Sequence, residues 1–342
     1  MKRFRLLFLT TMSAMLLACG GNDKEVLYLF NWSYYIPDEV LQDFRRETGI
    51  RVVLDTYDSN ESMYAKLATG NAQYDLTVPS ADYMELMREQ GMLAPLNHEW
   101  LPNLHHIEAE ILPLLAFDAE QAYSVPYFIG AAGINMNRNK TGELPASWAI
   151  FGDDRFKGRM TMMYDVRETL GVALAYLGYS VNSTDAEEIA QARDLLLEWK
   201  PNLLKFDAEM FGKDFASGSS VIAHGYAEVV LTELEAADGV DYQYLLPKEG
   251  GLVYVDNLVI LAGSKNVEGA HQLINYLLRP DVHARIADTF YYPTILTGAK
   301  ELRERTPAYE IAQLVELGYE VKRDVGSALA YYTRAWSEVQ SR

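Results

Sequence analysis

The chain has only one cysteine among its 342 residues, so it cannot form an internal disulfide. Its stability must therefore come from packing of its hydrophobic residues, which make up 49% of the sequence. Four catalytic or nucleotide-binding signatures are also missing: G-x-S-x-G, the Walker A motif, G-x-G-x-x-G and H-E-x-x-H. These absences argue against the common hydrolases, nucleotide-dependent enzymes and zinc proteases.

Positive charge is scarce. The 30 Lys and Arg residues are outnumbered by 48 Asp and Glu, which gives a formal net charge of -18. This balance argues against nucleic acid or an anionic membrane surface as a partner and favours attraction of cations. An acidic surface without any ligand is the alternative, and charge alone does not separate the two.

Histidine is poorly placed for metal binding. His105 and His106 are adjacent and cannot share a face, and His224 and Glu228 stand four apart without a third ligand. We expect no metal site and no cofactor.

The first residues have the pattern of a secretory signal. Lys2, Arg3 and Arg5 precede an apolar run over residues 6–17, which is too short to span a membrane comfortably. Cys19 follows Leu-Leu-Ala, and this arrangement resembles a bacterial lipobox. A buried structural cysteine is the alternative. We expect residues 1–18 to be removed and Cys19 to be acylated, which would anchor the protein to a membrane.

Strands and helices are expected to alternate along the chain. Strands are expected at 26–30, 50–57 and 74–79. Each is followed by a helical pattern: at 37–47, from 58 to about 70, and at 83–90. In the second of these helices, Asp58 and Glu61 have the spacing of a capping box. Three such units predict a parallel, doubly wound sheet. Further elements are expected at 159–164, from 168, at 186–199, 253–262 and 270–278.

The loops after the first three strands combine aromatic and polar residues. They read Trp-Ser-Tyr-Tyr at 32–35, Asp-Ser-Asn-Glu at 58–61 and Ser-Ala-Asp-Tyr at 80–83. Ligands of open α/β sheets bind outside the carboxyl ends of the strands. The aromatic rings of 32–35 therefore either complete the core or line a site. We expect Trp32 and Tyr35 to line a site and Tyr34 to support the core.

Asp165 and Glu168 are open to two interpretations. They could be the carboxylate pair of a hydrolase, or they could form a capping box at a helix start. Their spacing favours the cap.

Several longer stretches have a specific resemblance. FNWSYYIPDEVLQDFRRETGI, YDSNESMYAKLATG, YDVRETLGVALAYLGYS and LPKEGGLVYVDNLVI occur in the order seen in spermidine/putrescine-binding proteins of bacterial polyamine ABC transporters. The chain resembles this family over nearly its whole mature length. The resemblance implies the type II periplasmic binding protein fold: two α/β lobes, each a doubly wound sheet flanked by helices, with the ligand cleft between them. The lobes are expected at 26–128 plus 256–300 and at 129–255 plus 301–342.

The resemblance also implies a set of ligand-binding residues. A polyamine needs carboxylates at its ammonium groups and aromatic faces along its methylenes. Asp165 and Glu168 could serve both purposes, because one can cap the helix while the other binds the ligand. The implied residues, with Asp82 added for its charge, are Trp32, Ser33, Tyr35, Ser80, Asp82, Asp165, Glu168, Tyr254, Asp256 and Tyr292.

Three positions depart from the family pattern. Asp82 stands where an aromatic residue is usual, Ala223 where some members have Trp, and Lys322 where spermidine binders have Gln. The missing Trp removes one wall of the groove, and Asp82 adds charge. Lys322 would repel an ammonium group if it faced inward.

The expected function is capture of putrescine or spermidine by a monomeric, lipid-anchored protein in the periplasm or cell envelope. The protein would then deliver the ligand to an inner-membrane ABC permease. A polyamine sensor that docks on a membrane signalling receptor is the alternative. An enzyme is not expected, because the carboxylates lack accompanying catalytic groups.

Overall fold

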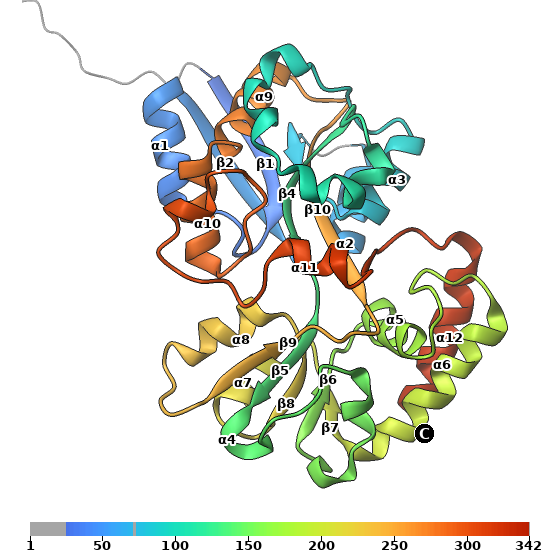
Figure 1. The fold of residues 1–342 in the computed structure, drawn as a ribbon. Coiled ribbons are helices and arrows are strands. Elements are labelled where there is room, and N and C mark those ends of the chain that lie inside the picture. Colours follow the sequence, from blue (N-terminus) through green and yellow to red (C-terminus); the bar gives the residue numbers. More distant parts are fainter. Residues whose placement is uncertain (1–24, 71–72, 342) are drawn as a thin grey trace, which may run out of the picture.

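The structure is a computed structural model that describes residues 25–70 and 73–341. Two β-sheets, each accompanied by helices, form the upper and lower lobes in Figure 1. The expected two-lobe α/β architecture is confirmed. The predicted signal segment and Cys19 lie outside the described residues.

The first sheet has the strand order β11-β10-β3-β1-β2, and β4 also pairs with β10. β1 pairs with β2 and β3 in parallel, as the first three strand–helix units predict. β10 runs antiparallel to both β3 and β4, so the complete sheet is mixed. Its strands are β1 (Glu25–Trp32), β2 (Ile50–Tyr57), β3 (Leu76–Thr77), β4 (Ser124–Gly130), β10 (Leu252–Ile260) and β11 (Glu320–Val321).

Helices of the first lobe contribute their apolar faces to one buried core. In α1 the acidic residues Asp38 and Glu39 occupy the first turn, and Gly49, at φ 80°, ends the helix in the left-handed conformation. In α2 the N-cap is Ser59, whose hydroxyl accepts from the Ser62 N–H, rather than the predicted Asp58. The helices are α1 (Asp38–Thr48), α2 (Asn60–Ala68), α3 (Ala81–Glu89), α9 (Val267–Leu277), α10 (Pro280–Phe290) and α11 (Ile311–Glu316).

The second sheet has the order β7-β6-β8-β5-β9. β6 is parallel to β7 and β8, whereas β5 is antiparallel to β8 and β9. Its strands are β5 (Gly133–Asn137), β6 (Met160–Met162), β7 (Leu203–Phe206), β8 (Ile222–Gly225) and β9 (Tyr242–Leu245). The accompanying helices are α4 (Arg138–Thr141), α5 (Val166–Tyr176), α6 (Ala186–Trp199), α7 (Phe211–Ala216), α8 (Ala227–Leu234) and α12 (Leu329–Ser341).

The hydrophobic cores divide the chain differently from the expected lobe boundaries. Val253 and Val255 pack in the first core, and so do residues of α11. C-terminal residues from Val325 onward pack in the second core. The first core thus includes residues of 253–255 and 308–321, a part of the chain for which the sequence predicts the second lobe. The chain passes between the two sheets after β4, before β10 and after β11.

Candidate functional site

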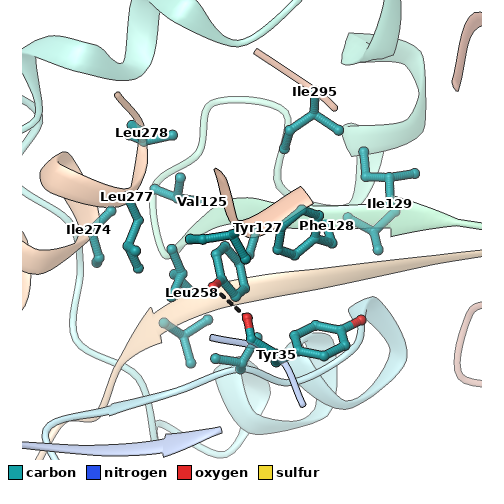
Figure 2. Packing of buried hydrophobic residues seen from close by; sticks show 14 of the residues in the cluster. Tyr35, Val125, Tyr127, Phe128, Ile129, Leu258, Ile274, Leu277, Leu278 and Ile295 are labelled. Atoms are coloured by element: carbon teal, nitrogen blue, oxygen red, sulfur yellow. Dashed lines mark hydrogen bonds between the residues drawn. The ribbon is translucent and has the colours of Figure 1, made fainter. Parts of the chain in front are cut away.

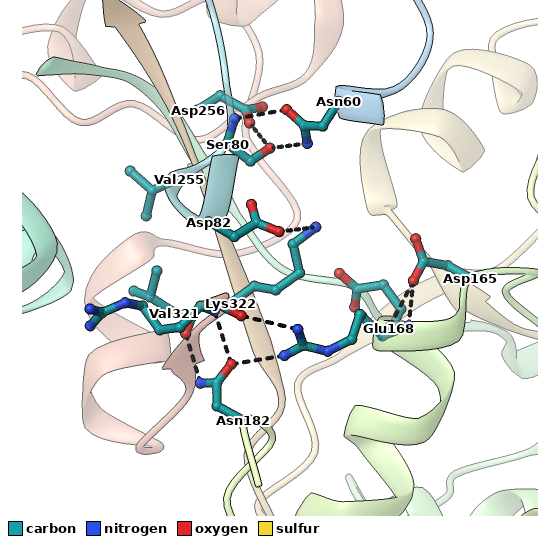
Figure 3. A network of polar contacts seen from close by, with 12 residues as sticks. Asn60, Ser80, Asp82, Asp165, Glu168, Asn182, Val255, Asp256, Val321 and Lys322 are labelled. Atoms are coloured by element: carbon teal, nitrogen blue, oxygen red, sulfur yellow. Dashed lines mark hydrogen bonds and ion pairs between the residues drawn. The ribbon is translucent and has the colours of Figure 1, made fainter. Parts of the chain in front are cut away.

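Asp256 connects three loops of the first lobe. Its Oδ1 accepts a hydrogen bond of 2.6 Å from Ser80 Oγ, and its Oδ2 accepts one from the Tyr35 hydroxyl. Asn60 Nδ2 donates to Ser80 Oγ at 3.0 Å, as Figure 3 shows. Tyr35, Asn60 and Ser80 come from the segments after β1, β2 and β3, so the carboxyl ends of these strands meet here.

The Asp256 carboxyl is buried, with 4% of the residue exposed. Burial raises its pKa to about 6, although the hydrogen bonds from Ser80 and Tyr35 act in the opposite direction. Burial disfavours the charged form of a carboxyl group unless a cation compensates for the lost solvation. The site therefore holds an anion that a bound cation would stabilise.

Aromatic rings pack around Tyr35, whose hydroxyl bonds to this carboxyl. Tyr35 lies 5.1 Å from Tyr292, 5.8 Å from Phe128 and 6.0 Å from Tyr127 between ring centroids. Tyr127 also donates a hydrogen bond of 2.8 Å to the Tyr35 carbonyl oxygen (Figure 2). Tyr35 is thus part of the hydrophobic core and presents its hydroxyl to Asp256.

Trp32 and Tyr34 behave differently. The Trp32 indole N–H donates to the Val78 carbonyl at 2.9 Å, and its ring lies 4.7 Å from that of Tyr57, which leaves it half-buried. Tyr34 is 83% exposed and has a φ of 59°. The predicted core role of Tyr34 is wrong, because the left-handed backbone at this residue turns its ring toward solvent while Tyr35 enters the core.

Ser33 lies at the edge of this group. Its hydroxyl donates to Asp58 Oδ1 at 2.9 Å, and this contact is exposed. The structure therefore brings Tyr35, Ser80, Asp256 and Tyr292 together, whereas Ser33 bonds to the start of the next loop.

Asp165 and Glu168 are at the start of α5 in the second lobe. Asp165 Oδ1 accepts hydrogen bonds from the backbone N–H groups of Arg167 and Glu168 at 2.8 and 2.9 Å, so Asp165 caps the helix as predicted. Within the described residues the Glu168 side chain does not bond back to the Asp165 N–H, so the second half of the predicted capping box does not form. Glu168 is 3% exposed. Its Oε1 accepts from the Tyr226 hydroxyl at 3.4 Å, and its Oε2 has no hydrogen-bond partner within the described chain. Burial, with the charge of Asp165, raises the Glu168 pKa to about 8.

A second buried glutamate follows β8. Glu228, in the first turn of α8, is 7% exposed and accepts a hydrogen bond of 3.2 Å from the Tyr254 hydroxyl. Burial raises its pKa to about 7. The rings of Tyr254 and Tyr226 meet edge to face, with centroids 5.5 Å apart. Burial raises the pKa of Tyr226, and the nearby charges of Glu168, Asp165, Glu228 and Asp256 raise it further.

Lys322 faces these acids. Its Nζ lies 3.6 Å from Asp82 Oδ2, and the two side chains are only 17% and 12% exposed. Figure 3 shows the lysine side chain extended toward Asp82, with Glu168 nearby. Burial alone would lower the pKa of Lys322, but Asp82, Asp165 and Glu168 raise it overall. The lysine is therefore a charged ammonium group inside the site.

Five carboxylates thus gather between the lobes, and we call them the interlobe carboxylates: Asp82, Asp165, Glu168, Glu228 and Asp256. Glu228 and Tyr226 were not predicted as site residues. The sequence offers one signal for Glu228, an acid within the mainly apolar stretch 220–231, but its spacing from His224 suggests only a shared metal site. Ala223 lies buried in β8 and packs with Phe211 and Phe215, so it does not face the interlobe carboxylates.

The interlobe carboxylates are not arranged as a metal centre. Within residues 25–70 and 73–341, no three His, Cys, Asp or Glu side chains could hold a metal ion together. In the same ranges, every helix is too short or too polar to cross a bilayer. A surface pocket lined by Glu25, Tyr28 and Asp75 lies at the amino ends of β1 and β3, at the far end of β1 from Tyr35.

Known proteins agree with this architecture. A family model described as bacterial extracellular solute-binding protein matches residues 39–313. The spermidine/putrescine-binding periplasmic protein of Salmonella typhimurium is 37% identical over 331 residues, which cover 95% of this chain and 94% of the relative.

Solved structures of related proteins also match over most of the chain. The TpPotD lipoprotein of Treponema pallidum has a TM-score of 0.88 at 39% identity, over 93% of this chain and 100% of its own. The spermidine/putrescine ABC transporter substrate-binding protein PotD of Streptococcus pneumoniae has a TM-score of 0.84 at 28% identity, over 93% of this chain and 99% of its own. The relatives are binding proteins rather than enzymes, and this chain belongs to the bacterial extracellular solute-binding protein family, with the type II periplasmic binding protein fold.

Proposed function

We propose that the protein binds a polyamine, putrescine or spermidine, between its lobes and delivers it to an ABC permease. The observation that carries this proposal is the excess of acidic side chains between the lobes. Five interlobe carboxylates face one lysine, and Glu168, Glu228 and Asp256 form no ion pair within the described residues. A ligand that brings ammonium groups would supply the missing positive charge.

The aromatic residues fit the remainder of such a ligand. Tyr35, Tyr292, Tyr254 and Tyr226 bring ring faces and edges close to Asp256 and Glu228. An aromatic face attracts an ammonium group by ~0.5–2 kcal/mol and also covers methylene groups. The names of the relatives support the same ligand class. The proposed binding residues are those that the sequence predicts, together with Glu228 and Tyr226.

The interlobe carboxylates come from both lobes. Asp82 and Asp256 belong to α3 and β10, whereas Asp165, Glu168 and Glu228 belong to α5 and α8. A ligand that pairs with both sets would favour the closed arrangement of the lobes, which the permease would then recognise. We propose lobes of 25–131 plus 252–322 and 133–251 plus 323–341, in agreement with the two cores.

The proposed location is extracytoplasmic, as family membership supports, with a lipid anchor at Cys19. Docking of the same closed form on a signalling receptor is the second candidate. We propose a monomer, because the interlobe carboxylates and their aromatic neighbours all come from one chain.

Isothermal titration calorimetry with putrescine, spermidine, spermine and cadaverine tests the ligand class. We expect micromolar or tighter binding of at least one polyamine, and no binding of an uncharged diol of similar length. Absence of binding to all four polyamines would refute the proposal. Reconstitution with the cognate permease would then separate transport from sensing.

A further inference from the structure

Lys322 has a fixed place in the site. It directly follows β11, and its backbone N–H donates to the Val253 carbonyl at 2.9 Å, which continues the pairing of β11 with β10. From this position its side chain reaches Asp82 Oδ2 at 3.6 Å (Figure 3). The ammonium group of this side chain is therefore held between the lobes by the chain itself.

Contacts on both sides of Lys322 hold the backbone. Asn182 Nδ2 donates to the Val321 carbonyl at 2.9 Å, and Asn182 Oδ1 accepts from the Arg323 N–H at 2.9 Å. The Arg323 guanidinium forms an ion pair of 2.5 Å with Glu85, in the same helix as Asp82. The backbone around Lys322 is thus bound to α3 of the first lobe and to the segment after α5 of the second.

The interlobe carboxylates divide into two groups by their relation to this lysine. Asp82, Asp165 and Glu168 all stabilise the charged Lys322, whereas the nearby Arg167 opposes it. Arg167 itself donates to the Arg323 carbonyl and to Asn182, so its guanidinium is engaged elsewhere. One ammonium group is therefore already supplied to this end of the site.

Asp256 and Glu228 form the other group. Within residues 25–70 and 73–341, neither forms an ion pair; they accept hydrogen bonds from neutral hydroxyls instead. Glu228 Oε2 has no hydrogen-bond partner in the same ranges. The charge of Asp256 contributes to the raised pKa of Glu228. The charge of Lys322 lowers the pKa of Asp256, but no cation of the described residues lies within ion-pair distance of either carboxyl group.

We propose that Lys322 acts as a built-in ammonium group beside Asp82, Asp165 and Glu168, and that Glu228 and Asp256 receive the ammonium groups of the ligand. This inference rests on the proposed function and narrows it. A diamine places one ammonium group at each free carboxylate. The additional ammonium group of a triamine meets Lys322 and is repelled, so Lys322 selects diamines over triamines.

The native protein gives the first test. Calorimetry should show putrescine bound at least tenfold more tightly than spermidine at pH 8. Equal binding, or tighter binding of spermidine, would overturn the inference while leaving polyamine binding intact. Failure of every polyamine to bind would instead overturn the proposed function.

Variants give the second test. Lys322→Gln should improve spermidine affinity at least tenfold relative to putrescine affinity, and Lys322→Arg should keep the native preference. Lys157→Gln is the matched control, because Lys157 is exposed and the substitution removes the same charge. A putrescine-to-spermidine ratio that changes less than threefold in a folded Lys322→Gln protein would contradict the role of the lysine.

Glu228→Gln examines the free end of the site without altering Lys322. We expect at least tenfold weaker binding of putrescine, with the melting temperature of the empty protein unchanged or raised. Putrescine binding that remains within twofold of native would remove Glu228 from the site. This variant keeps the inference testable even if the Lys322 variants do not fold.

Discussion

The Tyr35 hydroxyl donates a hydrogen bond to Asp256, which lies 221 positions further along the chain. One partner follows the first strand of the lobe, and the other lies in a strand that returns from the second lobe. The contact joins the aromatic core to the buried anion. Replacements at either end of it therefore separate the contributions to folding from those to binding.

Asp256→Asn should weaken polyamine binding by about 2–4 kcal/mol, because it leaves a ligand ammonium without its charged partner in a buried site. The amide keeps the shape of the side chain and can still accept from Ser80 or Tyr35. Calorimetry measures the loss. A change below about 0.5 kcal/mol, typical of exposed pairs, would place Asp256 outside the site.

Tyr35→Ala and Tyr35→Phe should affect the free energy of unfolding to different extents. The alanine variant leaves a cavity among Tyr127, Phe128 and Tyr292 and should lower the free energy of unfolding by ~3–5 kcal/mol. The phenylalanine variant retains the ring packing and loses only the hydroxyl bond to Asp256. Urea unfolding of the empty proteins distinguishes them, and similar destabilisation of both would contradict the core assignment.

The buried carboxyls should make stability and binding depend on pH in opposite ways. The pKa values of Asp256, Glu228 and Glu168 are raised to about 6, 7 and 8, mainly by burial. The empty folded protein keeps protons that the unfolded chain releases at its ordinary carboxyl pKa values, near 4. Its stability should therefore fall as pH rises from about 4 to 8. Lys322, whose pKa is raised, titrates above this window.

A bound polyamine favours the charged carboxylates, so its affinity should increase over the same pH range and binding should release protons. Calorimetry at pH 6 in two buffers of different ionisation enthalpy measures the protons released. Asp256→Asn and Glu228→Gln should each reduce that number. An affinity that is constant between pH 5.5 and 8.5 would show that these carboxyls do not contact the ligand.

Gly130→Ala should disturb the site through Tyr254. A Cβ atom at residue 130 would lie 2.4 Å from the Tyr254 hydroxyl oxygen, so the tyrosine would have to move, which would disturb its hydrogen bond to Glu228. We expect destabilisation of about 1–3 kcal/mol and weaker polyamine binding. Gly263→Ala is the control, because nothing lies within 4 Å of its added Cβ atom. Equal melting temperatures for the two variants would rule out this close approach.

Cys19→Ser should abolish acylation and release the protein from the membrane while leaving polyamine binding unchanged. Fractionation of cells that express each form, followed by calorimetry on the released protein, tests both parts. A serine variant that remains in the membrane fraction to the same extent as the parent would refute the lipobox prediction.

Local patterns in the sequence were sufficient for much of the architecture. The strand at 50–57 and the helix at 186–199 have the predicted bounds, and Asp165 caps α5 as its spacing indicates. These features depend on neighbours within a few residues: alternation of β-branched side chains, an apolar face at helical spacing, and a short hydrogen bond to the helix start. The family resemblance similarly followed from contiguous motifs.

Tertiary structure decided where individual side chains point. Tyr34 and Tyr35 are adjacent and chemically alike, yet one is exposed and the other buried, because the backbone turns between them and Asp256 accepts the second hydroxyl. The sequence alone could not place Lys322 inside the site, since its neighbours Asp82 and Glu168 come from different lobes. The place of Glu228 in the site likewise depends on burial and on a hydrogen bond from Tyr254, which lies in β10. The charge of the site thus depends on long-range contacts, which a local pattern does not encode.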